Sequence, residues 1–279
     1  MATGPALSSR PTPAARSPSM DHFELTLVSS RPLAPAVRHY TFVRSDGARQ
    51  PFIPGQFVQV HFEHEGVMLR RSYSIATPAD EAGALEVELA VSFVPGGAAT
   101  ALFENLSPGD RIQATGPNGR LVLQDGDRNQ RYLLVATGTG VTPYRSMLPL
   151  IRRRIAERGQ RFVLLFGART PGELLYGEEF AAFAEATPGF AFIPCFSRTG
   201  YQPPRPYERS GYVQAALAEL APTAEQDIAY LCGNPNMVDA AFEALKGAGL
   251  PIAHIRREKY ISPPSPRALP ARPADGPQA

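Results

Sequence analysis

Residues 131–143 read RYLLVATGTGVTP, and this stretch sets the architecture of the second half of the chain. The apolar run RYLLVA predicts a buried strand, and Gly138 and Gly140 permit a tight turn with close backbone approach. Pro143 suits the first turn of a helix, where a missing N–H is tolerated. A strand, a glycine-rich turn and a helix in this order predict free amides that face an anion such as a phosphate.

Two residues after the turn extend this interpretation. Thr142 can cap the helix through its hydroxyl, and Arg145 opposes the helix dipole unless an anion lies nearby. The string is neither the six-residue Rossmann fingerprint nor a P-loop, so a plain tight turn stays open as an alternative.

Strands and helices alternate from residue 131 onward. Strand-like runs occupy 162–168, 190–197 and 227–233, and helical patterns occupy 177–186, 212–220 and 237–249. This alternation predicts a doubly wound parallel sheet with its ligand site at the carboxyl ends of the strands. We assign this α/β domain to residues 127–262.

The first half of the chain has a different pattern. Six short runs rich in Val, Ile, Phe, Tyr and Thr are separated by turn residues, with one helical segment at 99–105. The runs lie at 23–30, 36–45, 57–62, 70–77, 84–91 and 111–117. They predict an antiparallel β-barrel domain over residues 21–126.

The two ends differ from this middle. Residues 1–20 hold Pro, Ser, Ala and Arg with no acidic residue, and residues 263–279 are again rich in proline. Both compositions predict disordered tails. A transit peptide and a true start at Met20 stay open for the first of them.

Composition narrows the class of protein. With 279 residues, 43% hydrophobic content and a net charge of +2, the chain is expected to be a soluble two-domain protein with no membrane anchor and no nucleic-acid role. The two cysteines, Cys195 and Cys232, are too few for a disulfide framework or a built-in iron–sulfur cluster. They favour the cytoplasm, and the histidines show no metal-ligand spacing, so we expect no metal.

Three strings, RRSYSIA at 70–76, VATGTGVTP at 135–143 and LCGNPNM at 231–237, together resemble the ferredoxin–NADP reductase superfamily over residues 23–261. The bacterial ferredoxin or flavodoxin reductases are the most similar branch. The resemblance implies bound FAD, with Arg71 and Ser72 in the pyrophosphate-binding motif, Tyr73 on the isoalloxazine face and Ser74 near the reactive nitrogen N5.

A second flavin element follows from the same resemblance. Gly97, Ala98, Ala99 and Thr100 match a glycine followed three positions later by a hydroxyl residue at a helix start. Thr100 would offer its hydroxyl to the pyrophosphate. The backbone of Leu89 and Ala90 would meet the adenosine half of FAD.

The remaining strings resemble the nicotinamide-nucleotide site. Gly138, Thr139 and Gly140 match the loop that holds the nucleotide phosphates, and Gly233, Asn234 and Pro235 match the turn beside the nicotinamide. Cys232 would lie near the site of hydride transfer, and a buried strand cysteine without function is the alternative.

The resemblance also implies NADP(H) rather than NAD(H). Ala168–Arg169 and Ser197–Arg198 match positions that hold the 2′-phosphate, and neither strand end offers a carboxylate. A further family arginine is missing because Tyr212 follows Gly211, and we expect Arg209 to substitute for it.

The string RREKYIS at 256–262 completes the resemblance. Glu258 and Tyr260 match a pair in which the aromatic ring stacks on the exposed flavin face and yields to the nicotinamide. Ser74, Cys232, Glu258 and Tyr260 are therefore the expected catalytic residues, and the 19 residues after Tyr260 must bend away or cover the site.

The expected function is a monomeric flavoprotein that carries electrons between NADPH and ferredoxin or flavodoxin, an acidic one-electron carrier. Two alternatives stay open: an NADH-dependent reductase component of an oxygenase, and an FAD-binding electron-transfer subunit without its own NADPH turnover. The basic run IRRRIAERGQR at 151–161 is either a solvated helix face or a docking patch for an acidic protein.

Overall fold

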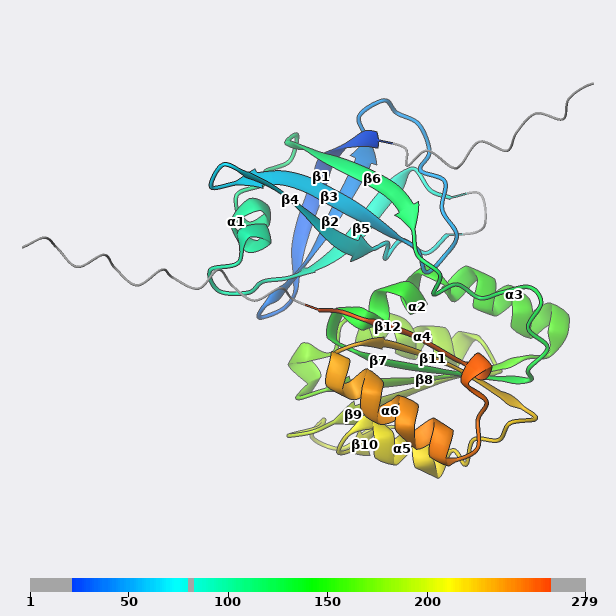
Figure 1. Cartoon of the computed structure of the whole chain (residues 1–279). Helices are drawn as coiled ribbons and strands as arrows, with labels where there is room; N and C mark the ends of the chain where they lie inside the picture. The colour runs from blue at the N-terminus through cyan, green and yellow to red at the C-terminus, as the bar shows by residue number, and fades with distance from the viewer. Residues whose placement is uncertain (1–21, 80–82, 262–279) are drawn as a thin grey trace, which may run out of the picture.

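The computed structural model describes residues 22–79 and 83–261, which form an antiparallel sheet followed by a parallel sheet flanked by helices (Figure 1). Both predicted disordered tails, 1–20 and 263–279, lie outside the described residues.

The first sheet has six antiparallel strands in the order β4-β3-β6-β1-β2-β5. An isolated bridge between Ile75 and Leu89 joins the two ends of the sheet and closes it into a barrel. The predicted antiparallel barrel is thereby confirmed, and a short helix α1 (Ala98–Glu104) follows β5. The strands are β1 (His22–Ala34), β2 (Val37–Arg44), β3 (Phe57–His64), β4 (Val67–Ser74), β5 (Glu86–Ser92) and β6 (Arg111–Asn118).

The second sheet is parallel throughout, in the order β10-β9-β8-β7-β11-β12. The direction of winding reverses between β7 and β11, and such a switch point opens a crevice at the carboxyl ends of the strands. The prediction of a doubly wound α/β domain is confirmed. The strands are β7 (Arg131–Thr137), β8 (Arg161–Ala168), β9 (Phe190–Phe196), β10 (Arg209–Ser210), β11 (Asp227–Gly233) and β12 (Ile255–Lys259).

Helices cover both faces of this sheet because successive strand side chains point to opposite faces. Tyr132 and Leu134 of β7 pack in one cluster with α2 (Thr142–Ser146), α3 (Leu148–Arg158) and α4 (Gly177–Ala186). Leu133 and Val135 pack in another with α5 (Val213–Glu219) and α6 (Pro235–Gly247). In the described part of the chain, no helix is long and apolar enough to cross a membrane.

The glycine-rich turn differs from the prediction. A 3₁₀ turn, η1 (Gly138–Val141), precedes the short helix α2, and the Thr142 hydroxyl donates to the Thr139 carbonyl at 2.8 Å. The expected capping by Thr142 is therefore wrong, since its oxygen does not accept a hydrogen bond from the helix amides. Because the 3₁₀ turn precedes α2, the Thr142 hydroxyl bonds back to that turn and not to the amides of the helix.

The anion expected near Arg145 belongs to the other domain. Arg145 lies on α2, between the two sheets in Figure 1, and its side chain is ion-paired with Glu88 of β5. Its Nε donates to Glu179 at 2.7 Å, and its Nη1 donates to the Ala76 carbonyl at 2.7 Å. Arg145 therefore connects the two domains instead of facing a phosphate.

Glu88 is the centre of this buried contact, with a side chain only 16% exposed. The His39 ring lies 3.6 Å from its carboxylate and bonds the Tyr176 hydroxyl at 2.9 Å. Burial alone would raise the pKa of Glu88, but the His39 hydrogen bond and the Arg145 charge outweigh it and lower that pKa to about 2. The charged form is thus stabilised only in the folded chain.

Residues 119–130 join the two domains and accept hydrogen bonds from arginine side chains of the second domain. Asp127 accepts two hydrogen bonds from Arg256 of β12, at 2.5 and 2.6 Å. Arg154 of α3 is buried and donates to the Leu123 carbonyl at 3.1 Å. The connection is therefore bound to the second domain through Leu123 and Asp127.

We expect Glu88→Gln to lower the free energy of unfolding by about 2 to 3 kcal/mol at pH 7. The pKa of Glu88 falls from the usual 4.5 to about 2 on folding, so its contribution is present above pH 4.5 and disappears as the pH falls towards 2. Denaturant unfolding from pH 7 to pH 2.5 measures this.

The matched control is Glu24→Gln, which removes a carboxylate from an exposed pair with Arg111 and should cost under about 1 kcal/mol. If the difference in free energy of unfolding between Glu88→Gln and the unchanged protein stayed constant from pH 7 to pH 2.5, the lowered pKa of Glu88 would be contradicted.

Candidate functional site

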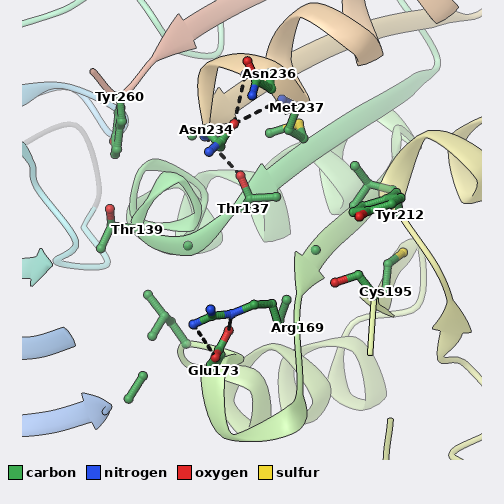
Figure 2. Close-up of a pocket in the computed structure, with 18 of the residues that line it drawn as sticks. Thr137, Thr139, Arg169, Glu173, Cys195, Tyr212, Asn234, Asn236, Met237 and Tyr260 are labelled. Atoms are coloured by element: carbon green, nitrogen blue, oxygen red, sulfur yellow. Dashed lines mark hydrogen bonds and ion pairs between the residues drawn. The ribbon is translucent and has the colours of Figure 1, made fainter. Parts of the chain in front are cut away.

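A cleft of about 1260 Å³ opens at the carboxyl ends of the second sheet. One wall comes from the first domain, through residues 34–37 and Ser92. The predicted residues that line the cleft are Gly138, Thr139, Ala168, Arg169, Ser197, Gly233, Asn234 and Tyr260. Figure 2 shows Tyr260 at one side of the cleft, Tyr212 at the other and Arg169 below them.

The floor of the cleft depends on a close approach between two backbone segments. A Cβ at Gly140 would lie 2.6 Å from the Gly233 Cα and would also collide with the Cys232 carbonyl. Gly233 has a φ of +126° and sits against the Thr137 carbonyl, so it too excludes a side chain. Gly140 is thus a packing residue beneath the cleft rather than part of its lining.

Asn234 caps helix α6 at the edge of the cleft. Its side-chain Oδ1 accepts hydrogen bonds from the backbone amides of Asn236 at 2.9 Å and Met237 at 3.4 Å (Figure 2). The backbone amide of Asn234 donates to the Thr137 hydroxyl at 3.1 Å. Pro235 follows as a first-turn residue of the helix and does not line the cleft. The side chain that could meet a ligand is therefore held by the helix start.

Ser74 and Tyr260 meet across the domain interface, although 186 positions separate them. Their hydroxyls form a short hydrogen bond, and the Tyr260 amide donates to the Gly233 carbonyl at 2.8 Å. Cys232 and Glu258 are paired in register on β11 and β12, just below. The four predicted catalytic residues thus lie together beside one end of the cleft, and of the four only Tyr260 contributes to its lining.

Burial controls the titration of this group. It raises the pKa of the Cys232 thiol well above its usual range, and the neighbouring Glu258 carboxylate raises it further. Burial likewise raises the pKa values of the Tyr260 hydroxyl and of Glu258. Cys232 and Tyr260 are therefore neutral hydrogen-bonding groups at pH 7, and Cys232 is not a thiolate.

The other end of the cleft carries an ion pair that the sequence did not reveal. Arg169 binds Glu173 of η2 (Pro171–Glu173) through two contacts of 2.6 and 2.7 Å (Figure 2). The expectation that no carboxylate lies near the carboxyl end of β8 is therefore wrong. Glu173 stands four residues after Arg169, and the turn of η2 brings it back into the cleft.

Two other arginines expected at this end do not line the cleft. Arg198 is exposed, and its amide donates to the Arg169 carbonyl at 3.1 Å. Arg209 of β10 is paired with Glu219 of α5 at 2.9 Å, and its expected substitution for the missing family arginine stays a prediction.

The expected flavin residues lie on β4 and its neighbours. Arg71 is partly exposed and donates to the Arg70 carbonyl at 2.8 Å, and Ser72 is exposed beside Gln59. The Tyr73 ring meets Phe103 edge to face at 5.2 Å, and burial raises the pKa of its hydroxyl. Successive side chains of β4 alternate between its two faces, so Arg71 and Tyr73 share one face and Ser72 lies on the other.

The second flavin element is partly engaged within the protein. The Thr100 hydroxyl accepts from the Val94 amide at 2.8 Å, so its oxygen holds the turn before α1. Gly97 precedes α1 in extended conformation, with Ala98 and Ala99 in the first turn. Leu89 and Ala90 are buried in β5, paired with Tyr40 and His39 of β2.

Several lining residues were not predicted from the sequence. Tyr212, 73% exposed, stands directly before α5 and projects beside the cleft (Figure 2). An aromatic residue between a strand end and a helix start was a usable signal. The wall at Ala34–Val37 and the Met237 side chain carry no such signal, because only the packing of the two domains brings them to the cleft.

Two family models match the chain. The Oxidoreductase FAD-binding domain covers residues 24–123, and the Oxidoreductase NAD-binding domain covers residues 134–243. They correspond to the antiparallel and the parallel sheet.

Similar proteins include ferredoxin–NADP reductase B of Sorangium cellulosum, which is 38% identical over 245 residues, 85% of this chain and 97% of that protein. The reductase subunit of an aromatic O-demethylase from Amycolatopsis sp. is 38% identical over 214 residues, 75% of this chain and 61% of that protein. The crystal structure of a cytochrome P450 reductase from Amycolatopsis superposes with a TM-score of 0.74 at 32% identity, covering 89% of this chain and 73% of that chain.

We expect Gly140→Ala to lower the free energy of unfolding by about 2 kcal/mol or more, because the new methyl group meets backbone that cannot rotate away. Nicotinamide nucleotide binding should weaken with it. Gly247→Ala is the control, since nothing lies within 4 Å of a Cβ there and alanine favours the end of α6. Denaturant unfolding and nucleotide titration check both, and a neutral Gly140→Ala would contradict the packing argument.

Proposed function

Because the chain belongs to the ferredoxin–NADP reductase family of FAD- and NAD(P)-binding oxidoreductases, we propose that it carries electrons between NADPH and a one-electron carrier protein, ferredoxin or flavodoxin. The observation that carries the proposal is the hydrogen bond between Ser74 and Tyr260, which joins the FAD-binding domain to the end of the nucleotide cleft.

The residues on β4 fit FAD by their chemistry. The Arg71 guanidinium suits a pyrophosphate, the Ser72 hydroxyl can add a hydrogen bond, and the Tyr73 ring offers an aromatic face. We propose that these residues, with the segment Gly97–Thr100 and the backbone of Leu89 and Ala90, hold the cofactor. Thr100 would act through its remaining hydroxyl proton, since its oxygen already binds the Val94 amide.

FAD held by these residues would supply the redox chemistry, exchanging a hydride with the nicotinamide and single electrons with the carrier protein. The protein supplies position and exclusion of water. Tyr260 lies half-buried at the end of the cleft, tied by its hydroxyl to Ser74 and by its amide to Gly233. We propose that its ring covers this end of the cleft until the nicotinamide takes its place.

Ser74, Cys232 and Glu258 would then order the contact. The Ser74 hydroxyl, once released by Tyr260, can donate to an acceptor at the reacting end. Cys232 keeps its proton because burial raises its pKa, so it contributes shape and a weak hydrogen bond without acting as a base. Most of the catalysis would come from positioning.

At the phosphate end, Gly138 and Thr139 at the start of the turn would meet the nucleotide pyrophosphate, with Gly233 and Asn234 beside them. Arg169 and Ser197 would lie at the adenosine ribose. Ala34–Val37 of the first domain would cover the bound nucleotide, which would therefore be held between the two domains.

A second function is favoured by particular observations. Relatives include an aromatic O-demethylase reductase subunit, of which this chain spans 61% of the length, and Glu173 places a carboxylate near the adenosine end. A reductase that serves an oxygenase and accepts NADH fits these two observations. In either function the chain would deliver electrons to a protein partner.

Anaerobic stopped-flow mixing of the FAD-loaded protein with NADPH, and separately with NADH, tests the proposal by flavin absorbance. We expect rapid bleaching followed by reoxidation on addition of ferredoxin or flavodoxin. Bleaching without transfer to either carrier would favour the oxygenase-reductase function. Flavin that neither nucleotide reduces would refute the proposal.

We expect Ser74→Ala to slow flavin reduction about tenfold or more, because a hydrogen-bond donor at the reacting end is lost. Nucleotide affinity should stay equal or rise, since the Tyr260 ring is no longer tied down. The control is Ser45→Ala, which removes a serine from an exposed hydroxyl pair with Thr26 in the same domain. An unchanged reduction rate in Ser74→Ala would remove Ser74 from the mechanism.

A further inference from the structure

The Glu173 carboxylate occupies the adenosine end of the nucleotide cleft. Its two oxygens meet Nε and Nη2 of Arg169 at 2.7 and 2.6 Å, the fork-to-fork contact that a guanidinium makes with a carboxylate or a phosphate (Figure 2). Both residues line the cleft. The Glu173 side chain is 29% exposed and the Arg169 side chain 60% exposed, so a ligand can reach the pair.

A second cation acts on the same carboxylate. The charge of Arg198 contributes to lowering the pKa of Glu173, after the hydrogen bond and charge of Arg169. The Arg198 amide is bonded to the Arg169 carbonyl, so the turns after β8 and β9 lie against each other. Glu173 is thus bound directly by Arg169, and the charge of Arg198 on the neighbouring turn also favours its ionised form.

We propose that Glu173 takes the position that the 2′-phosphate of NADPH would use and is the residue that sets the preference between NADPH and NADH. The proposal rests on the proposed function, because it takes the cleft to be the nicotinamide-nucleotide site. A 2′-phosphate must break the Glu173–Arg169 contact and then stand beside a displaced carboxylate.

The two nucleotides meet Glu173 differently. The ribose of NADH carries a 2′-hydroxyl, which can donate to a carboxylate without displacing it from Arg169. The 2′-phosphate of NADPH brings about two negative charges, which Glu173 repels and Arg169 attracts. Glu173 therefore weakens the binding of NADPH selectively and lets the chain bind NADH as well.

Adenosine 2′,5′-bisphosphate and 5′-AMP differ only in the 2′-phosphate, and calorimetric titration of the FAD-loaded protein measures both without any turnover. We expect Glu173→Gln to lower the Kd for adenosine 2′,5′-bisphosphate about tenfold. The Kd for 5′-AMP should stay within about twofold of the value for the unchanged protein. Unchanged or weaker binding of the bisphosphate would overturn the proposal.

Glu243→Gln is the matched control, since it removes the same charge from a pair with Lys246 on α6, outside the cleft. It should leave both Kd values within about twofold, because Glu243 is exposed and does not line the cleft, so solvent and salt screen its charge. A tenfold gain in Glu243→Gln would mean that net charge alone governs binding and would also overturn the proposal.

The double variant Arg169→Gln with Glu173→Gln tests whether Arg169 binds the 2′-phosphate. It should lose the gain of Glu173→Gln, binding the bisphosphate about tenfold more weakly than that single variant. Equal binding would show that Arg169 does not receive the phosphate, against the proposal. Failure of the proposed function is distinguishable, because it would appear as a flavin that neither nucleotide reduces while these Kd values still follow Glu173.

Discussion

The buried ion pair between Glu88 and Arg145 connects the two domains, and the site depends on it. Glu88 comes from the barrel and Arg145 from the first helix after the glycine-rich turn, and His39 and Glu179 complete their hydrogen bonds. In surroundings of low polarity, removing one partner would leave a buried charge without compensation. The pair therefore disfavours rotation of one domain against the other, and such a rotation would separate Ser74 from Tyr260.

Close backbone packing fixes the other half of the site. Gly140 lies against the backbone of Cys232 and Gly233, and Gly233 in turn accepts the Tyr260 amide. The glycine-rich turn, the end of β11 and the end of β12 thus form one continuous floor. Any ligand at the carboxyl ends of the strands would meet main-chain groups whose positions are set by contact, while side chains such as Thr139 and Asn234 add the polar groups.

Charge at the adenosine end shows why counting arginines is insufficient. Arg169 and Arg198 stand where a 2′-phosphate would be expected, yet Arg169 is neutralised by Glu173, and Arg209 by Glu219. Of these three arginines, Arg169 is the one that lines the cleft, and a carboxylate already engages it. Cofactor preference in such a cleft depends on the pairing of each cation as much as on its presence.

The sequence alone determined the two-domain architecture, because strand periodicity, turn residues and the alternation from Arg131 onward depend on local physics. It also located the glycines and the residues Ser74, Cys232, Glu258 and Tyr260, since their spacing follows recognisable strings. Only the tertiary structure decided which ionisable groups meet. Arg145 with Glu88, Glu173 within the cleft and Ala34–Val37 as its wall all arise from packing between distant segments, which local patterns do not encode.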